Sequence, residues 1–357
     1  MKTATLATAL AISLSTALTA VSANADTARV YIPEGRADAI RIVDAVTGQD
    51  VGRIVGTEAV HGLAGSPNSR YLVAGSYMEI DRDDATEMSK PAAVSDDEHA
   101  AHHSKPKKAL GPSDAGVSLL SVIDAATGDL LRKIEVPGAV HHVAISPDGR
   151  FAVSTHPSSD GISVADLDNF ELVAWIPTGS MPNYAVFGTN PGIVYISNAG
   201  NGTVSEVDLE LGIVRRNMIA GEAPEHLTMS SDGGMLFVAD ADIGRIVEID
   251  LSTGRDVRTF EIGGEIHGLD LSEDQAHLMV AAKETDRIVS IDLRSGNIVD
   301  AVLSPAPYHL TTIPGTGSIF VSSRDEPKVW IVDGKTLTAT KEIPIEGEGH
   351  QMVALSK

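Results

Sequence analysis

A segment that opens with a short apolar run, and that often carries histidine, recurs along the chain at a nearly constant spacing. Its equivalent positions are His141, Asn183, Glu225, His267, Tyr308 and His350, and successive differences between these numbers are 42, 42, 42, 41 and 42 residues. An earlier copy begins at His61. A period of about 40 to 45 residues is typical of stacked equivalent units such as propeller blades. We therefore expect one array of repeated units.

Each unit contains four short runs that favour β-strands. In the unit that begins near His141 we expect strands at 142–146, 151–155, 162–166 and 171–177, because β-branched runs there are separated by Pro, Gly, Asn and Asp. The count of units gives seven inner strands. The first strand, 29–33, matches the second strand of a unit, whereas 352–356 is a lone inner strand. The pattern predicts an all-β, seven-bladed β-propeller of four-stranded blades, closed by the C-terminal strand.

The repeat resembles the YVTN-type propeller repeat. The resemblance is carried by Ser-Pro-Asp-Gly at 146–149, by Ser-Val-Ile-Asp-Ala-Ala-Thr-Gly at 121–128 and by Ile-Asp-Leu-Ser-Thr-Gly at 249–254. It implies the propeller fold. It implies little about function, because such propellers serve as enzymes, haem carriers and binding platforms.

The N-terminal segment predicts export. Lys2 precedes an apolar stretch over residues 4–21, and Ala23-Asn24-Ala25 has the small-x-small form that a signal peptidase cleaves. We expect a signal peptide at 1–25, cleavage after Ala25, and a single propeller domain at 26–357. No later segment has the roughly 20 continuous apolar residues of a membrane span, so we expect a periplasmic protein without a membrane anchor.

Composition restricts the chemistry of partners and metal sites. The chain has no cysteine, which excludes thiolate metal sites, iron–sulfur clusters and covalent CxxCH haem attachment. Its formal charge of −22 repels phosphate backbones and concentrates cations. We expect no nucleic-acid partner, and nitrogen and oxygen ligands for any bound metal.

Two adjacent columns of the repeat contain an excess of histidine. The first column holds His61, His141, Asn183, Glu225, His267, Tyr308 and His350, and the second holds Gly62, His142, Tyr184, His226, Gly268, His309 and Gln351. Both columns lie where an inner strand begins, so they share one mouth of the central channel. Zinc takes about four nitrogen or oxygen ligands at roughly 2.0 to 2.2 Å. The candidate metal ligands are His61, His141, His142, Glu225, His226, His267, His309 and His350. The alternative for each histidine is that it satisfies backbone groups or lines a water-filled channel.

One insertion breaks the period. His61 and His141 are 80 positions apart, and the extra residues fall at about 81–115, between the expected second and third strands of a blade. This segment is charged and lacks an apolar period, so we expect a flexible loop. The topology places it at the same mouth as the histidine columns. Its candidate metal ligands are Glu98, His99, His102 and His103, with a solvated loop as the alternative. Outside these groups, we expect structural roles for His156 and His277.

Catalytic motifs are not found. The chain has no HExxH, GxSxG or P-loop motif. We therefore expect a protein that is not an enzyme.

The signal peptide, the cysteine-free YVTN-like repeats, the mouth histidines and the histidine-rich insertion together resemble the periplasmic zinc metallochaperones of the Azt type. The resemblance implies that the chain binds zinc and passes it to the solute-binding protein of a zinc ABC importer, and we expect it to be a monomer. Two alternatives remain: a haem d1-type or electron-transfer propeller, and a lactonase-like propeller enzyme.

Overall fold

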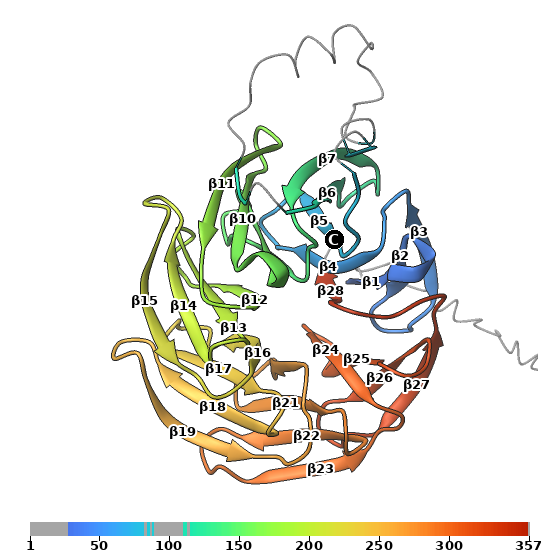
Figure 1. The fold of residues 1–357 in the computed structure, drawn as a ribbon. Coiled ribbons are helices and arrows are strands. Elements are labelled where there is room, and N and C mark those ends of the chain that lie inside the picture. The colour runs from blue at the N-terminus through green and yellow to red at the C-terminus, as the bar shows by residue number, and fades with distance from the viewer. Residues whose placement is uncertain (1–27, 82–83, 86–87, 89–109, 113–114, 356–357) are drawn as a thin grey trace, which may run out of the picture.

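The computed structural model describes residues 28–81, 84–85, 88, 110–112 and 115–355. Seven four-stranded antiparallel sheets surround a central channel (Figure 1), so the predicted seven-bladed β-propeller is confirmed. Short 3-10 turns, η1 (Gly35–Ala37) and η2 (Pro157–Ser159), join the second and third strands of the first and third blades. No helix among the described residues is long and apolar enough to cross a bilayer.

The strands of each blade run from the channel outward. Blade 1 contains β28 (Val353–Leu355), β1 (Arg29–Glu34), β2 (Ala39–Asp44) and β3 (Asp50–Val55), and blade 2 contains β4 (Val60–Gly65), β5 (Tyr71–Ser76), β6 (Val117–Asp124) and β7 (Leu130–Pro137). Blade 3 contains β8 (Val143–Ile145), β9 (Phe151–His156), β10 (Gly161–Asp166) and β11 (Glu171–Pro177), and blade 4 contains β12 (Pro182–Phe187), β13 (Ile193–Asn198), β14 (Thr203–Asp208) and β15 (Ile213–Ile219). Blade 5 contains β16 (Pro224–Met229), β17 (Met235–Asp240), β18 (Arg245–Asp250) and β19 (Arg255–Glu261). Blade 6 contains β20 (Leu269–Leu271), β21 (His277–Ala282), β22 (Arg287–Asp292) and β23 (Ile298–Val302), and blade 7 contains β24 (Pro307–Ile313), β25 (Ser318–Ser323), β26 (Lys328–Asp333) and β27 (Ala339–Pro344).

The hydrophobic core lies between neighbouring blades. The middle strands are buried on both faces because each blade is covered by the next; every residue of β10 is buried, for example. Between blades 3 and 4, Val153 and Ile162 pack in one cluster with Val194 and Ile196. The outer strands are mostly exposed or partly exposed, and β15 and β19 each bury a single residue. This pattern explains why β-branched residues dominate the repeat.

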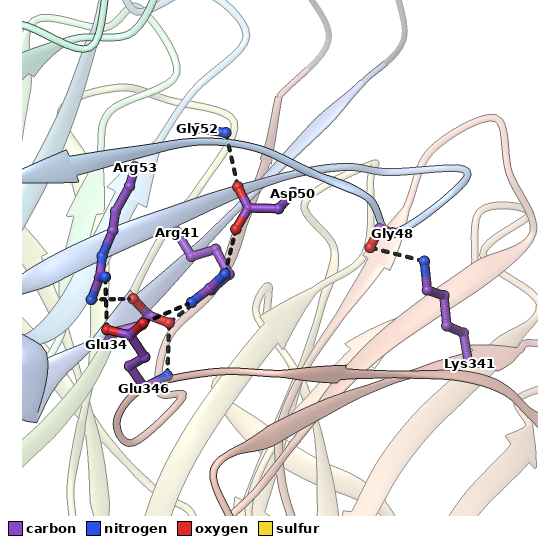
Figure 2. Close-up of polar contacts among 8 residues, drawn as sticks. All are labelled: Glu34, Arg41, Gly48, Asp50, Gly52, Arg53, Lys341 and Glu346. Atoms are coloured by element: carbon purple, nitrogen blue, oxygen red, sulfur yellow. Dashed lines mark hydrogen bonds and ion pairs between the residues drawn. The ribbon is translucent and has the colours of Figure 1, made fainter.

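The C-terminal strand closes the ring. β28 pairs antiparallel with β1, with Arg29 opposite Leu355 and Tyr31 opposite Val353. An ionic cluster holds the chain that leads into β28 against blade 1 (Figure 2). The fully buried carboxylate of Glu34 accepts hydrogen bonds from Arg41 Nε and from the backbone N of Glu346, both at 2.8 Å. Arg53 joins the cluster, 2.9 Å from Glu34 Oε2 and 2.7 Å from Glu346 Oε2.

The insertion leaves blade 2 at the expected connection between β5 and β6. The backbone N of Tyr77 donates to the carbonyl of Ala59, so the insertion starts beside the beginning of β4. Ile80 forms an isolated antiparallel bridge with Val117, and buried Ala85 packs in a cluster with Val117. Its candidate ligands Glu98, His99, His102 and His103 lie outside the described residues. Their proposed roles stay predictions.

Candidate metal centre

The starts of the inner strands bring seven histidines to one end of the channel: His61, His141, His142, His226, His267, His309 and His350. The imidazole centroids of His61 and His350 are 3.3 Å apart, and those of His309 and His350 are 3.8 Å apart. His226 lies 4.4 Å from both His267 and His309. Five of the seven are buried, whereas His61 and His141 are partly exposed. The eight mouth residues predicted from the columns therefore lie together, with Glu225 beside His267.

Irregular strand pairing aims consecutive side chains at the channel. The register of β24 shifts between Pro307 and Leu310, so Tyr308 and His309 both lie in an unpaired stretch. The same shift occurs at the starts of β4, β12 and β16. Such irregularities re-aim side chains that would otherwise point to opposite faces of a regular strand. Both columns consequently contribute to one cluster, which simple alternation along a strand does not predict.

Glycines let the inner strands approach closely at this mouth. The backbone N of Gly268 donates to the carbonyl of Tyr308 at 2.9 Å, and a Cβ at position 268 would lie 2.7 Å from that same oxygen. At Gly62 a Cβ would lie 2.9 Å from the backbone of His142. The two glycines thus replace side chains where there is no room for them.

Backbone carbonyls orient several imidazoles. Nδ1 of His142 lies 2.8 Å from the carbonyl of Asn183, and Nδ1 of His350 lies 3.1 Å from the carbonyl of His61. A carbonyl only accepts hydrogen bonds, so Nδ1 carries the proton and Nε2 keeps its lone pair. Nε2 of His350 lies 3.0 Å from Nε2 of His309, from which it accepts a hydrogen bond. Nε2 of His142 and Nε2 of His226 are buried without a hydrogen-bond partner. Histidines that bind metal commonly donate their other ring N–H in this way.

Three groups of histidines present their nitrogens closely enough to hold a metal ion. They are His61–His141–His350, His142–His226–His309 and His267–His309–His350, and in each group the ligand atoms lie within 4.8 Å of one another. Ligand atoms around tetrahedral zinc are roughly 3.3 Å apart, given Zn–N bonds of about 2.0 Å. Small ring rotations would therefore close each group around an ion. The third group shares His309 and His350 with the other two, so at most two groups can be filled together.

Burial keeps the cluster in its metal-binding protonation state. It lowers the pKa of His142, His226, His267, His309 and His350 well below the ordinary value, and mutual repulsion among the imidazoles adds to this effect. The pKa of His61 falls to about 2 for the same reasons. Imidazoles with lowered pKa values are neutral at pH 7, as metal ligation requires. Burial also raises the pKa of Glu225, whose Oε2 lies 3.0 Å from His267 Nδ1.

Two further column residues lie beside the cluster and also line the channel below it. The ring of Tyr184 lies 4.6 Å from His142 and 4.5 Å from His226, and burial raises its pKa to about 12. The side chain of Gln351 accepts from the backbone N of Leu63 and donates to the carbonyl of Val143 at 2.9 Å. Its Nε2 also lies 3.5 Å from Tyr184 Oη. The sequence placed both residues in the second column without assigning them a role.

A cavity of about 390 Å³ continues the channel below Tyr184 and Gln351. It extends along the inner strands to Ser66, Pro67 and Pro147, in the turns at the opposite end of the propeller. Asp270 lines this cavity, and sequence analysis did not identify it. A signal was present: where β20 carries Asp270, the aligned inner-strand positions are Ala64, Ala144, Val186, Thr228, Thr311 and Val353.

The remaining histidines lie outside the cluster. His156 is fully buried, with Nε2 3.1 Å from Ser154 Oγ and Nδ1 3.2 Å from the carbonyl of Gly138. Burial lowers its pKa to about 4. His277 begins β21, and its backbone N donates to Ser272 Oγ in the turn at the end of the blade opposite the cluster. The contacts of the His156 ring agree with the structural role expected for it, and His277 lies away from the cluster.

Comparisons with known proteins identify the fold. No known family profile matches this sequence, and no curated protein matches it. Among solved structures, the periplasmic gluconolactonase PpgL of Pseudomonas aeruginosa aligns over 92% of this chain and 98% of its own, with 14% identity and a TM-score of 0.67. A Bacteroides fragilis protein named for 6-phosphogluconolactonase activity aligns over 93% and 99%, with 13% identity and a TM-score of 0.70. The dihydro-haem d1 dehydrogenase NirN aligns over 88% of this chain and 63% of its own, with 13% identity and a TM-score of 0.60.

These comparisons correct the expectation that the chain is not an enzyme. Proteins named as lactonases and as a dehydrogenase share its fold, so the lack of short catalytic motifs does not exclude catalysis. At 13–15% identity, however, no activity is established for this chain. What the comparisons show is the fold, a seven-bladed β-propeller whose buried histidines could hold a metal ion.

Proposed function

We propose that this chain is a periplasmic zinc metallochaperone, which holds zinc at the histidine mouth of its channel and passes it to the solute-binding protein of a zinc ABC importer. One observation carries the proposal. Three groups of three histidines lie at one end of the channel, and within each group the ligand atoms are no more than 4.8 Å apart. The Nε2 atoms of His142 and His226 are buried without hydrogen-bond partners. Buried polar atoms are rarely left unsatisfied without a reason.

The donor set supports a borderline transition metal as cargo. All of the clustered donors are imidazoles, with one carboxylate, Glu225, beside them. Imidazole suits zinc, and also copper and nickel, which bind such sites at least as tightly under the Irving–Williams order. The choice of zinc therefore rests on the resemblance to the Azt-type metallochaperones. Export to the periplasm rests on the predicted signal peptide.

The graded burial of the cluster supports a role in transfer. His61 and His141 are partly exposed, whereas His142, His226 and His309 are almost completely buried. A partner protein that docks at this mouth could reach the outer ligands first and exchange them one at a time. Its own ligands would replace the imidazoles in turn, so the ion need not pass free through water.

A zinc titration tests the metal site. Purified wild-type protein, stripped with a chelator, should rebind zinc stoichiometrically in competition with an indicator. Joint replacement of His309 and His350 by Gln should lower zinc affinity by at least about 100-fold, because these two residues together belong to all three ligand groups. His277→Gln, at the opposite end of the propeller, is the matched control and should bind like wild type. Unchanged affinity in the double variant would contradict the proposal.

Two further measurements separate this function from the alternatives. An absorption spectrum of the purified protein distinguishes haem from zinc, since haem is coloured and zinc is not. Zinc transfer is measured with a fluorescent cognate solute-binding protein, in parallel with a chelator that only captures released ion. Direct transfer requires that the acceptor fill faster than the spontaneous release of zinc allows.

A further inference from the structure

The cavity below the histidine cluster has a shape and a charge that the proposed metal site does not explain. Its upper end is lined by Tyr184, Gln351 and His309, and its lower end by Ser66 and exposed Pro67. His309 belongs to two of the three histidine groups. The cavity therefore connects solvent at the far mouth with a candidate metal ligand.

The carboxyl group of Asp270 faces this cavity from the middle of β20. Oδ1 accepts from the backbone N of Leu271 at 2.8 Å, and Oδ2 accepts from the backbone N of Thr312 at 2.9 Å. Among the described ion pairs, none involves Asp270. Burial raises the pKa of this group, so a cation that approached it would favour its ionised form. Among the described residues that line the cavity, it is the only one with a carboxylate.

The histidine mouth carries charges of both signs close to its rings. Lys283 Nζ lies 5.9 Å from the centre of the Tyr308 ring, and the Arg324 guanidinium lies 5.2 Å from it. The two cations are paired with Glu265 and Glu348. Glu225 adds a third carboxylate, with its Oε2 3.0 Å from Nδ1 of His267. The cations at this mouth are therefore matched by carboxylates, whereas the carboxyl group of Asp270 in the cavity has no described ion-pair partner.

The cavity is also large enough for a hydrated ion. Six waters of a hydration shell occupy roughly 180 Å³ at about 30 Å³ each. The cavity of about 390 Å³ exceeds this volume. The cavity therefore has room for a metal ion together with a hydration shell.

We propose that free divalent metal ions load the histidine cluster through this cavity, from the mouth opposite the insertion, with the carboxylate of Asp270 as a transient ligand below His309. The inference rests on the proposed function and deepens it. Loading and delivery then use opposite ends of the propeller. The mouth that carries the insertion stays free for a partner protein while the cluster fills from the other side.

Rapid mixing of the stripped full-length protein with zinc tests the path. Asp270→Asn should slow loading by about tenfold, the lower range for electrostatic focusing of a charged ligand, while the equilibrium affinity stays within a few-fold of wild type. Asp274→Asn is the matched control. Asp274 also belongs to blade 6 but lies in the exposed turn after β20. Its Oδ1 accepts a hydrogen bond from Ser272 Oγ at 2.7 Å, and the amide oxygen of Asn can accept the same bond. It should load like wild type.

A second variant tests the path without touching charge. Ala144→Leu adds volume to a half-buried residue of the cavity wall and should also slow loading. Circular dichroism checks that each variant is folded. A wild-type loading rate in either Asp270→Asn or Ala144→Leu overturns the loading path. If wild-type protein binds no stoichiometric zinc at all, the proposed function fails instead, so the two failures are distinguishable.

Discussion

Acid should destabilise the metal-free protein through its buried histidines. Six imidazoles of the cluster have a pKa well below the ordinary value because they are buried beside one another: His61, His142, His226, His267, His309 and His350. In the unfolded chain each returns to about 6.5. A histidine whose folded-state pKa is lowered contributes its full stability above the unfolded pKa and loses it as the pH falls below that value.

The magnitude follows from proton linkage. Between pH 7.5 and 5.5, an imidazole that titrates only in the unfolded state costs about 1.4 kcal/mol of unfolding free energy. Six such groups give an upper limit of about 8 kcal/mol, comparable to the whole stability of a typical domain, about 5 to 15 kcal/mol. Glu225 and Asp270 act in the opposite direction, because burial raises their pKa values. The net loss should still be several kcal/mol.

Urea unfolding of chelator-stripped protein at pH 7.5, 6.5 and 5.5 measures this loss. The midpoint should fall steadily with acidification. Replacing His142, His226 and His309 together by Gln removes half of the six imidazoles and should remove about half of the pH dependence. A midpoint that is the same at pH 7.5 and 5.5 would refute the reasoning, because it would mean that the cluster is hydrated or already protonated in the folded state.

Three other changes test separate parts of the molecule. Deletion of 98–103 should leave the equilibrium zinc affinity within a few-fold of wild type but change the rate of zinc transfer to a solute-binding protein by at least about tenfold, as measured by stopped flow. An unchanged transfer rate would mean that the loop has no role in transfer. A loss of equilibrium affinity would mean that its histidines are ligands of the main site. Glu34→Gln should lower the free energy of unfolding, measured with urea, by about 3 kcal/mol because it breaks a fully buried ion cluster. Glu346→Gln changes a more exposed carboxylate and should lower it by less than about 1 kcal/mol. Equal losses in the two variants would contradict the role of burial. Gly268→Ala should weaken zinc binding by pushing an inner strand outward, and Gly52→Ala, where no atom lies closer than 3.7 Å to the new Cβ, should not; equal affinities would show that the cluster tolerates the shift.

The repeat period was sufficient to predict the fold. Four strands per 42 residues, seven copies and a lone final strand lead to one architecture, and the strand boundaries differ by a residue or two. For example, 171–177 agrees with β11, whereas 142–146 shortens to β8 (Val143–Ile145). The difference arises because His142 lies before the ladder begins. The period shows which residues occupy the same position in each blade. In a closed ring of such blades, this is enough to predict the order of the strands.

The site was harder to predict than the fold. The columns identified which histidines share a mouth, but the register shifts and the close approach at Gly268 determine which rings meet. Those features depend on contacts between blades that no local pattern records. Asp270 was missed because it is one carboxylate in a column of the repeat that otherwise holds Ala, Val and Thr. Its position becomes informative only when the structure shows a cavity beside it.

The pairing of β28 with β1 has a consequence for how the protein is made. His350 immediately precedes β28, and it belongs to two of the three histidine groups. A nascent chain that has not yet released its last residues from the ribosome, or one clipped before that point by a protease, lacks both the final strand and this imidazole. Only a sealed ring would then capture metal through the two groups that contain His350, whereas the His142–His226–His309 group does not include a residue from this end of the chain.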